Sequence, residues 1–216
     1  MFINIHTHSP AGPHEWAIQN LHNHFEKAAE AGHFSLGLHP WYLNEHTYKA
    51  ELLSLQQMSR QDYVLAIGEC GLDKICKTPA GLQEKVFREQ LLWANEINKP
   101  LIIHCVKAHN EVLKMIQTCR SKVPVIFHGF NKSKHLALSI LDAGHWLSFG
   151  KALHQTSLSE IFALIPAERF FLETDQAGIT IEQQYALAGK IRNLSADQLD
   201  RQLKENANTV FKVNID

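Results

Sequence analysis

The sequence of 216 residues lacks long hydrophobic runs, an excess of one charge and a rich cysteine content. Its apolar stretches are only long enough for strands, and no basic segment stands ahead of a long apolar one. We therefore expect no membrane span and no secretory signal. Lys and Arg number 21 against 22 Asp and Glu, so no overall field favours nucleic acid or an anionic membrane. These absences predict a cytoplasmic protein without a membrane partner.

The sequence shows no sign of disulfide bonds or of more than one domain. The four cysteines have neither zinc-ribbon nor Cys-x-x-Cys spacing, and we predict that they are free thiols. No flexible linker, low-complexity tract or internal repeat interrupts the chain. With 45% hydrophobic residues it can bury a large core, which predicts a single domain over residues 1–216.

Short apolar runs alternate with segments of helical periodicity. The runs predict eight strands, over residues 2–6, 16–21, 34–38, 63–68, 101–104, 123–128, 146–149 and 170–173. Between them the periodicity predicts helices over residues 81–98, 109–119, 133–143, 157–164 and 181–194. Such alternation predicts an α/β fold with parallel strands, and eight strands favour a TIM (β/α)8 barrel over an open doubly wound sheet. Residues 9–18 and 22–31 leave room for little helix, so the early β/α units are expected to be trimmed.

Histidines and carboxylates stand where these strands end. His6 and His8 are two residues apart, so both side chains can point to one place beyond the first strand. A parallel barrel gathers the carboxyl ends of its strands on one face, which predicts a ring of polar side chains there. Packing so many imidazoles and carboxylates together without a cation would cost several kcal/mol, on the order expected for unpaired buried charges. The side chains at these strand ends, all candidates for such a centre, are His6, His8, His39, Glu69, His104, His128, Glu173 and Asp175.

Four histidines and two carboxylates already exceed the number of ligands that one tetrahedral ion takes from a protein, so we expect two divalent ions that share a carboxylate. Glu69 is the expected bridge, because Gly68 before it permits a close approach of the backbone. The mixed nitrogen and oxygen donors favour zinc, manganese, iron or nickel and disfavour calcium, with magnesium kept among the candidates.

Several short motifs, in this order, resemble the TatD family of metal-dependent hydrolases in the amidohydrolase superfamily. They are His6-x-His8, GLHP at 37–40, GECGLD at 68–73, the stretch 83–105, FHGF at 127–130, SFG at 148–150, ETD at 173–175 and ENANTVF at 205–211. The resemblance implies a TIM barrel with a binuclear centre that hydrolyses phosphodiester bonds, DNase-like, by means of a water activated between two ions.

The same resemblance assigns roles to residues. His6, His8 and Asp175 would hold one ion, His104 and His128 the other, with Glu69 between the ions. Asp175 could also accept the proton of the attacking water, so Asp175 and Glu69 are the expected catalytic residues. His39 has no place among the ligands and is expected to contact substrate or to support the ligands. Asp73 and Asn206 are expected to brace loops or to cap helices.

Four departures from the family pattern bear on the substrate. Asn4 stands where an aspartate is usual, and Val106 replaces an arginine suited to gripping phosphate. Lys107, one position later, should point elsewhere than that arginine and is kept as a candidate substrate contact. Gln176 replaces a usual proline, and the segment after it is short enough for a helix to begin at Ile181. These losses predict a small phosphodiester or a nucleic-acid end as substrate, and no strong binding of long DNA.

Two alternatives stay open from sequence. The first is a carbon-centred hydrolase of the lactonase or amidase type, since the same activated water attacks a carbonyl. The second is a non-catalytic barrel that keeps its metal for stability or partner binding. Neither the oligomeric state nor the identity of the metal follows from the residues.

Overall fold

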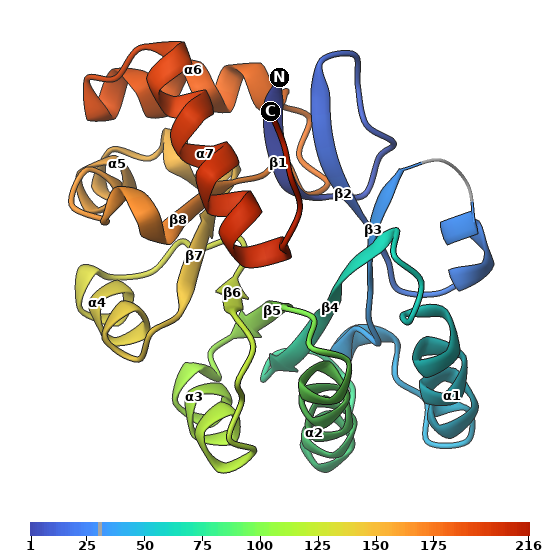
Figure 1. Cartoon of the computed structure of the whole chain (residues 1–216). Coiled ribbons are helices and arrows are strands. Elements are labelled where there is room, and N and C mark those ends of the chain that lie inside the picture. Colours follow the sequence, from blue (N-terminus) through green and yellow to red (C-terminus); the bar gives the residue numbers. More distant parts are fainter. Residues whose placement is uncertain (30–31) are drawn as a thin grey trace. The chain divides into compact units, whose positions relative to one another are not determined.

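The structure is a computed structural model that describes residues 1–29 and 32–216 (Figure 1). Contacts within the chain divide it into two compact units, and each is treated by itself below. The first unit comprises residues 1–19 and 126–216, and the second comprises residues 20–125. The single domain predicted over residues 1–216 stays a prediction.

The eight predicted strands are all present, and they follow one another in the sheet in chain order. The five strand pairings described in detail are parallel. Within the first unit, Thr7 at the end of β1 forms a further parallel bridge with Asp175, just after β8. Sequential parallel order with this last bridge is the connectivity of a (β/α)8 barrel. The strands are β1 Phe2–Thr7, β2 Glu15–Leu21, β3 His33–Leu36, β4 Val64–Asp73, β5 Leu101–Val106, β6 Val125–Phe127, β7 Trp146–Phe149 and β8 Phe170–Leu172.

The first unit builds its helices around β1, β7 and β8. In Figure 1, α6 and α7 lie beside β1, and contacts join both helices to that strand. Each begins with a capping box, Thr180 with Gln183 in α6 and Ser195 with Gln198 in α7, which satisfies backbone N–H groups that the first turn leaves open. The helices of this unit are α4 Lys134–Asp142, α5 Thr156–Phe162, α6 Ile181–Arg192 and α7 Ala196–Phe211.

The second unit packs three helices on β3, β4 and β5. These helices are α1 Tyr48–Met58, α2 Ala80–Ile97 and α3 His109–Thr118. Figure 1 shows α1 and α2 side by side, and α2 contacts β4 over much of its length. The core beneath them includes Phe34, Leu36, Leu55, Val64 and Val86, all nearly inaccessible to water.

The trimmed early units are confirmed as far as the chain is described. No helix lies between β1 and β2, and among the described residues between β2 and β3 there is only the short 3-10 helix Phe25–Ala29. Residues 30 and 31 of the predicted trimmed segment lie outside the described residues. All four cysteines are free, as expected. Across the described chain, no helix combines the length and the apolarity needed to pass through a bilayer.

Three elements differ from the sequence prediction. Strand β4 runs to Asp73 instead of ending near residue 68, because Cys70 to Asp73 continue to pair with β5. The register shifts at Gly68 and Glu69, and such irregularities often accompany functional sites. Helices α1 and α7 were not predicted. The sequence of α1 carries a weak apolar stripe, since it buries only Tyr48 and Leu55 and exposes Leu53. Helix α7 had a clear signal, the capping box at Ser195, which the sequence analysis passed over.

Candidate metal centre

The end of β1 places two imidazoles against one carboxylate in the first unit. His6 is fully buried in the strand, and His8 lies just beyond it, partly accessible. Their Nε2 atoms lie 3.6 and 3.3 Å from the same oxygen, Oδ1 of Asp175. We call His6, His8 and Asp175 the β1 cluster. Their ligand atoms lie within 4.8 Å of one another, close enough for one cation to contact all three.

The backbone holds Asp175 in place. Its N–H donates to the carbonyl of His6 at 3.0 Å, and its φ of 52° lies in the left-handed region that non-glycine residues rarely adopt. Burial favours the neutral carboxyl, but the hydrogen bonds from His6 and His8 and the charges of His6 and His128 outweigh it and hold the pKa of Asp175 well below its usual range. An ionised carboxylate facing two imidazoles is a ready cation ligand.

His128, which follows β6, lies beside this cluster, with its ring centroid 4.3 Å from that of His6. Its Nδ1 lies 3.3 Å from Oε1 of Glu173, and the same oxygen accepts the N–H of Gly129 at 2.8 Å. Because a carboxylate only accepts, Nδ1 of His128 carries the proton and Nε2 carries the lone pair that could bind a metal. This supporting role of Glu173, which is fully buried, was not predicted from the sequence.

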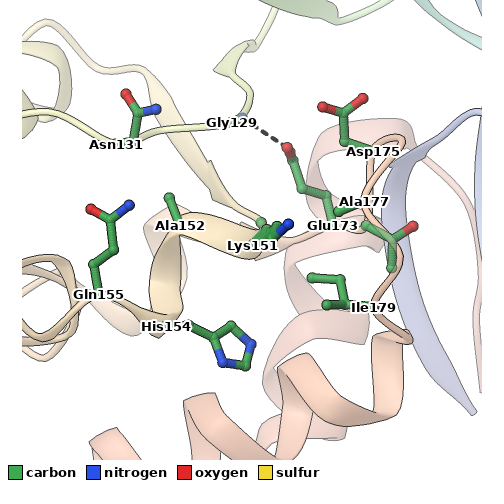
Figure 2. Close-up of a pocket in the computed structure, with 12 residues that line it drawn as sticks. Gly129, Asn131, Lys151, Ala152, His154, Gln155, Glu173, Asp175, Ala177 and Ile179 are labelled. Carbon is green, nitrogen blue, oxygen red and sulfur yellow. Dashed lines mark hydrogen bonds between the residues drawn. The ribbon is translucent and has the colours of Figure 1, made fainter.

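A pocket of about 570 Å³ opens next to Asp175 and Glu173 in the same unit. Figure 2 shows Glu173 and Asp175 on one side of it and Asn131 and Gln155 on the other, with Lys151 and His154 between. Lys151 and His154 are exposed, and neither forms an ion pair within the described chain. The pocket therefore offers cationic and amide groups beside the β1 cluster, and none of these four residues was predicted. Its lining is Gly129, Asn131, Gly150, Lys151, Ala152, His154, Gln155, Glu173, Thr174, Asp175, Ala177 and Ile179.

The second unit contains the ligands His39, Glu69 and His104, which we call the β4 cluster. Oε1 of Glu69 lies 3.1 Å from Nε2 of His39 and 2.8 Å from Nδ1 of His104. The expectation about Gly68 is confirmed, because a Cβ there would overlap the carbonyl oxygen of Ile102. The N–H of Glu69 donates to Asn20 Oδ1 at 2.7 Å, which fixes the carboxylate further. All three side chains of the cluster are buried.

His104 lies between two carboxylates. Its Nε2 lies 3.0 Å from Oδ2 of Asp73, which also accepts the indole N–H of Trp41 at 2.6 Å. Burial raises the pKa of Asp73, but the hydrogen bonds of His104, Trp41 and the Ile75 backbone outweigh it, so the pKa lies below the usual value. An ionised Asp73 fixes the proton of a neutral His104 on Nε2. The Nδ1 lone pair then faces the carboxylate of Glu69, an arrangement that a cation between the two groups would stabilise.

His39 carries its ring proton on the same nitrogen as His104, but it turns that nitrogen towards Glu69. The backbone N–H of Trp41 donates to Nδ1 of His39 at 3.1 Å, so the neutral ring carries its proton on Nε2 and donates it to Glu69. A nitrogen that carries a proton cannot bind a metal. Although His39 lies within the β4 cluster, its geometry therefore suits bracing of Glu69 better than ligation, in line with the expectation that it supports the ligands.

The other residues singled out from sequence take structural places. Asp73 accepts the N–H of Ile75 at 2.8 Å and so braces its loop as expected, in addition to its contact with His104. Asn206 donates to the carbonyls of Ala167 and Phe170, both at 2.9 Å, which braces the start of β8. Asn4 joins β1 to Thr174, whose N–H and hydroxyl it contacts. Lys107 is exposed, has a φ of 53° and forms no ion pair among the described residues; its contact with substrate stays a prediction.

Comparison with known sequences adds an independent observation. A family model described as "TatD related DNase" matches residues 4–212. A metal-dependent hydrolase from Buchnera aphidicola is 32% identical over 151 residues, and the match covers 65% of this chain and 54% of that protein. A protein of Pantoea ananatis named "3'-5' ssDNA/RNA exonuclease TatD" is 34% identical over 148 residues, covering 64% and 55%. The matches thus span a little over half of the length of these two relatives.

Comparison with solved structures bears on the fold. The crystal structure of YJJV, a TatD homolog from Escherichia coli K12, superposes with a TM-score of 0.86 and covers 99% of this chain and 98% of that one. The two sequences are 24% identical, so the likeness shows a shared fold. The predicted (β/α)8 class is thereby confirmed.

Proposed function

Because this chain belongs to the family of TatD-related DNases, we propose that it is a metal-dependent hydrolase that cleaves a phosphodiester bond at the end of a single-stranded nucleic acid. The observation that carries the proposal is the convergence of His6 Nε2 and His8 Nε2 on one oxygen of Asp175. Two imidazoles and a carboxylate form a ligand set typical of catalytic metal sites in hydrolases. The β4 cluster supplies further nitrogen and oxygen donors.

Two divalent ions fit the donors of this chain. His6, His8 and Asp175 would hold one ion, His104 and His128 the other, with Glu69 shared, as the family pattern implies. The protonation inferred for each supporting histidine agrees with this set, because Asp73 and Glu173 leave a lone pair on His104 and His128. Zinc, manganese, iron and nickel suit the mixed donors.

Bound divalent ions in such a centre polarise a phosphoryl oxygen and lower the pKa of water. The residues of this chain would transfer the proton, orient the ligands and bind the substrate. Asp175, ionised and partly accessible, would take up a proton from the attacking water. His39 would hold Glu69 in one orientation through its Nε2–H. The pocket of Figure 2 would seat the substrate, with Lys151 offering positive charge and His154 a ring N–H to phosphate oxygens.

The two alternatives differ in what they require of the chain. A carbonyl substrate would suit a purely apolar pocket, whereas this pocket carries Lys151 and His154 together with Ala177 and Ile179. A non-catalytic barrel would tolerate ligands that turn away from one another, whereas the ligands of each cluster face each other. Both observations favour the phosphodiesterase. The cytoplasmic location and the weak binding of long DNA stay predictions.

The test is hydrolysis of a single-stranded oligonucleotide labelled at either end, with added manganese or zinc. We expect stepwise shortening by the wild type that stops with a chelator, and a loss of at least about a hundredfold in Glu69→Gln, as for removal of one electrostatic catalytic group. Glu96→Gln is the matched control, since Glu96 is an exposed glutamate of α2 that pairs with Arg60. Full activity of Glu69→Gln, or activity that survives complete removal of metal, would contradict the proposal.

A further inference from the structure

One tryptophan of this chain is placed unlike the other three. Trp16, Trp93 and Trp146 are buried, with 7 to 8% of their surface exposed, whereas Trp41 is 54% exposed. Its neighbour Tyr42 is equally exposed. Both residues belong to the short 3-10 helix Pro40–Tyr42, which directly follows His39 of the β4 cluster. Large aromatic side chains in water are a feature of binding surfaces.

The exposed ring of Trp41 is held rigidly. Its indole N–H donates to Asp73 Oδ2 at 2.6 Å, and its backbone N–H donates to His39 Nδ1 at 3.1 Å. The ring centroid lies 5.1 Å from that of His39 and 5.7 Å from that of His104, both at steep interplanar angles. Tyr42 is supported in a similar way, because His22 stacks on it at 4.5 Å and 25°. Two aromatic side chains are thus fixed in position beside the β4 cluster while much of their surface faces water.

Because Trp41 and Tyr42 are fixed beside the β4 cluster, the ligand that binds them must also suit the cluster. A molecule that reaches both the cation-binding groups and the indole must carry an anionic group and a flat apolar face a few ångströms away. A nucleotide has both, in its phosphate and its base. Stacking of a base on an aromatic ring stabilises single-stranded binding by about 1–3 kcal/mol, and a rigid ring loses little conformational entropy.

We propose that Trp41 is a stacking platform for the nucleobase next to the scissile phosphodiester, with Tyr42 extending the platform to a neighbouring base. The proposal rests on the proposed function and assigns the side chain that holds the base at that site. It requires an unpaired nucleotide, because a paired and stacked base has no free face to offer. Stacking on an indole face requires no base-specific hydrogen bond, so all four bases are accepted. This contact would supply affinity that the chain does not obtain from an arginine at position 106.

Binding is tested first, on zinc-loaded protein with phosphorothioate oligonucleotides that resist hydrolysis, so that the result does not depend on catalysis. Because the other three tryptophans are buried, oligothymidylate should quench mainly the fluorescence of Trp41, and an abasic oligonucleotide of equal length should not. Trp41→Phe should abolish the quenching while fluorescence anisotropy still detects binding of a labelled oligothymidylate. Equal quenching by both oligonucleotides, or undiminished quenching in Trp41→Phe, would overturn the proposal.

Kinetics then test the role of the base in turnover. The measured quantity is the ratio of kcat/KM for the base-bearing to the abasic oligonucleotide, which cancels any general loss of activity that follows from releasing Asp73. We expect Trp41→Ala to lower the ratio about 5- to 150-fold, mainly through KM, and Trp41→Phe to retain most of it. Leu53→Ala, which removes an exposed apolar side chain of α1, is the control and should keep the ratio.

The outcomes separate the two proposals. If the wild type cleaves both oligonucleotides equally well, or if Trp41→Ala leaves the ratio unchanged, the stacking platform is wrong and the hydrolase stands. If the wild type cleaves neither oligonucleotide but shows base-dependent quenching that Trp41→Phe abolishes, the stacking platform stands and the hydrolase is wrong.

Discussion

His104 lies between two carboxylates, and its suitability as a metal ligand depends on which of its ring nitrogens carries the proton. Its ligand role could be expected from sequence, because it ends a predicted strand. The contact with Asp73 that selects its protonated nitrogen could not, since Asp73 lies 31 positions away and its loop-bracing role was the only one suggested by its motif. The same holds for Glu173 and His128, 45 positions apart. Candidate ligands could be named from sequence at this scale, and their role as ligands stays a prediction, whereas the orientation of each ring required the folded structure.

Replacing Asp73 tests that orientation. Asp73→Asn keeps the size of the side chain but removes the charge that fixes the Nε2 proton of His104. We expect metal affinity to fall about 10- to 100-fold, as for loss of a hydrogen-bond partner of a ligating histidine. Competition with a fluorescent chelator measures it, with Asp142→Asn at the exposed end of α4 as the control. A metal affinity equal to that of the wild type would show that Asp73 braces only its loop and does not orient His104.

Lys151 tests the pocket beside the β1 cluster. In Lys151→Ala we expect KM for an oligonucleotide to rise about tenfold with little change in kcat, because a phosphate contact of this kind binds ground state and transition state alike. The dependence of log KM on log salt should also become shallower by about one unit, as one charge contact is lost. Lys134→Ala, an exposed lysine at the start of α4, is the comparison. An unchanged dependence of log KM on log salt would show that Lys151 does not contact a phosphate of the bound oligonucleotide.

At the scale of elements, strands were predicted better than helices. All eight strands were found because each contains a short, mostly apolar run that is largely buried. Strand β4 was cut short because Glu69 and Gly71 interrupt the apolar pattern, although pairing with β5 continues to Asp73. Helix α1 escaped prediction because its exposed Leu53 obscures the apolar stripe. Side chains presented by loops and short helices, such as Trp41 and Lys151, had no periodic pattern to mark them.

Two glycines test how the backbone positions Glu69. Gly68 has a φ of 149° and no room for a Cβ against Ile102, so Gly68→Ala should lower the free energy of unfolding by about 3 kcal/mol or more. Gly81, in the first turn of α2, has nothing within 4 Å of its missing Cβ. Gly81→Ala should raise the same free energy by about 0.5–1 kcal/mol. Urea unfolding followed by circular dichroism compares the two, and equal effects would contradict this account.

At the scale of the whole molecule, the balance of charge says little about the substrate. Charged groups nearly cancel over the chain, which predicts no large basic surface. The features that favour a nucleotide are instead local: a lysine and a histidine in one pocket, and two aromatic rings beside one cluster. Composition could exclude classes of partner, but only the tertiary placement of a few side chains could suggest one.

The stability of the whole fold should fall in mild acid through His145. Burial, helped by the charge of Arg169, lowers the pKa of His145 in the folded chain. Below a pH of about 6.5 the unfolded chain takes up a proton that the folded chain resists, so the folded state loses up to about 1.4 kcal/mol per pH unit from this group. In His145→Gln the free energy of unfolding, measured by urea titration, should change less between pH 7 and pH 5. His46→Gln, an exposed histidine, is the control, and identical pH slopes in all three proteins would refute the assignment.

The central claim is that the two clusters hold two metal ions, and elemental analysis of the purified chain tests it most directly. After loading with manganese or zinc and removal of excess metal, we predict about two ions per wild-type chain, and fewer in Glu69→Gln and in Asp175→Asn. Two ions in the wild type with losses in both variants would support the centre. A wild-type chain that retains no metal under any loading condition would contradict it.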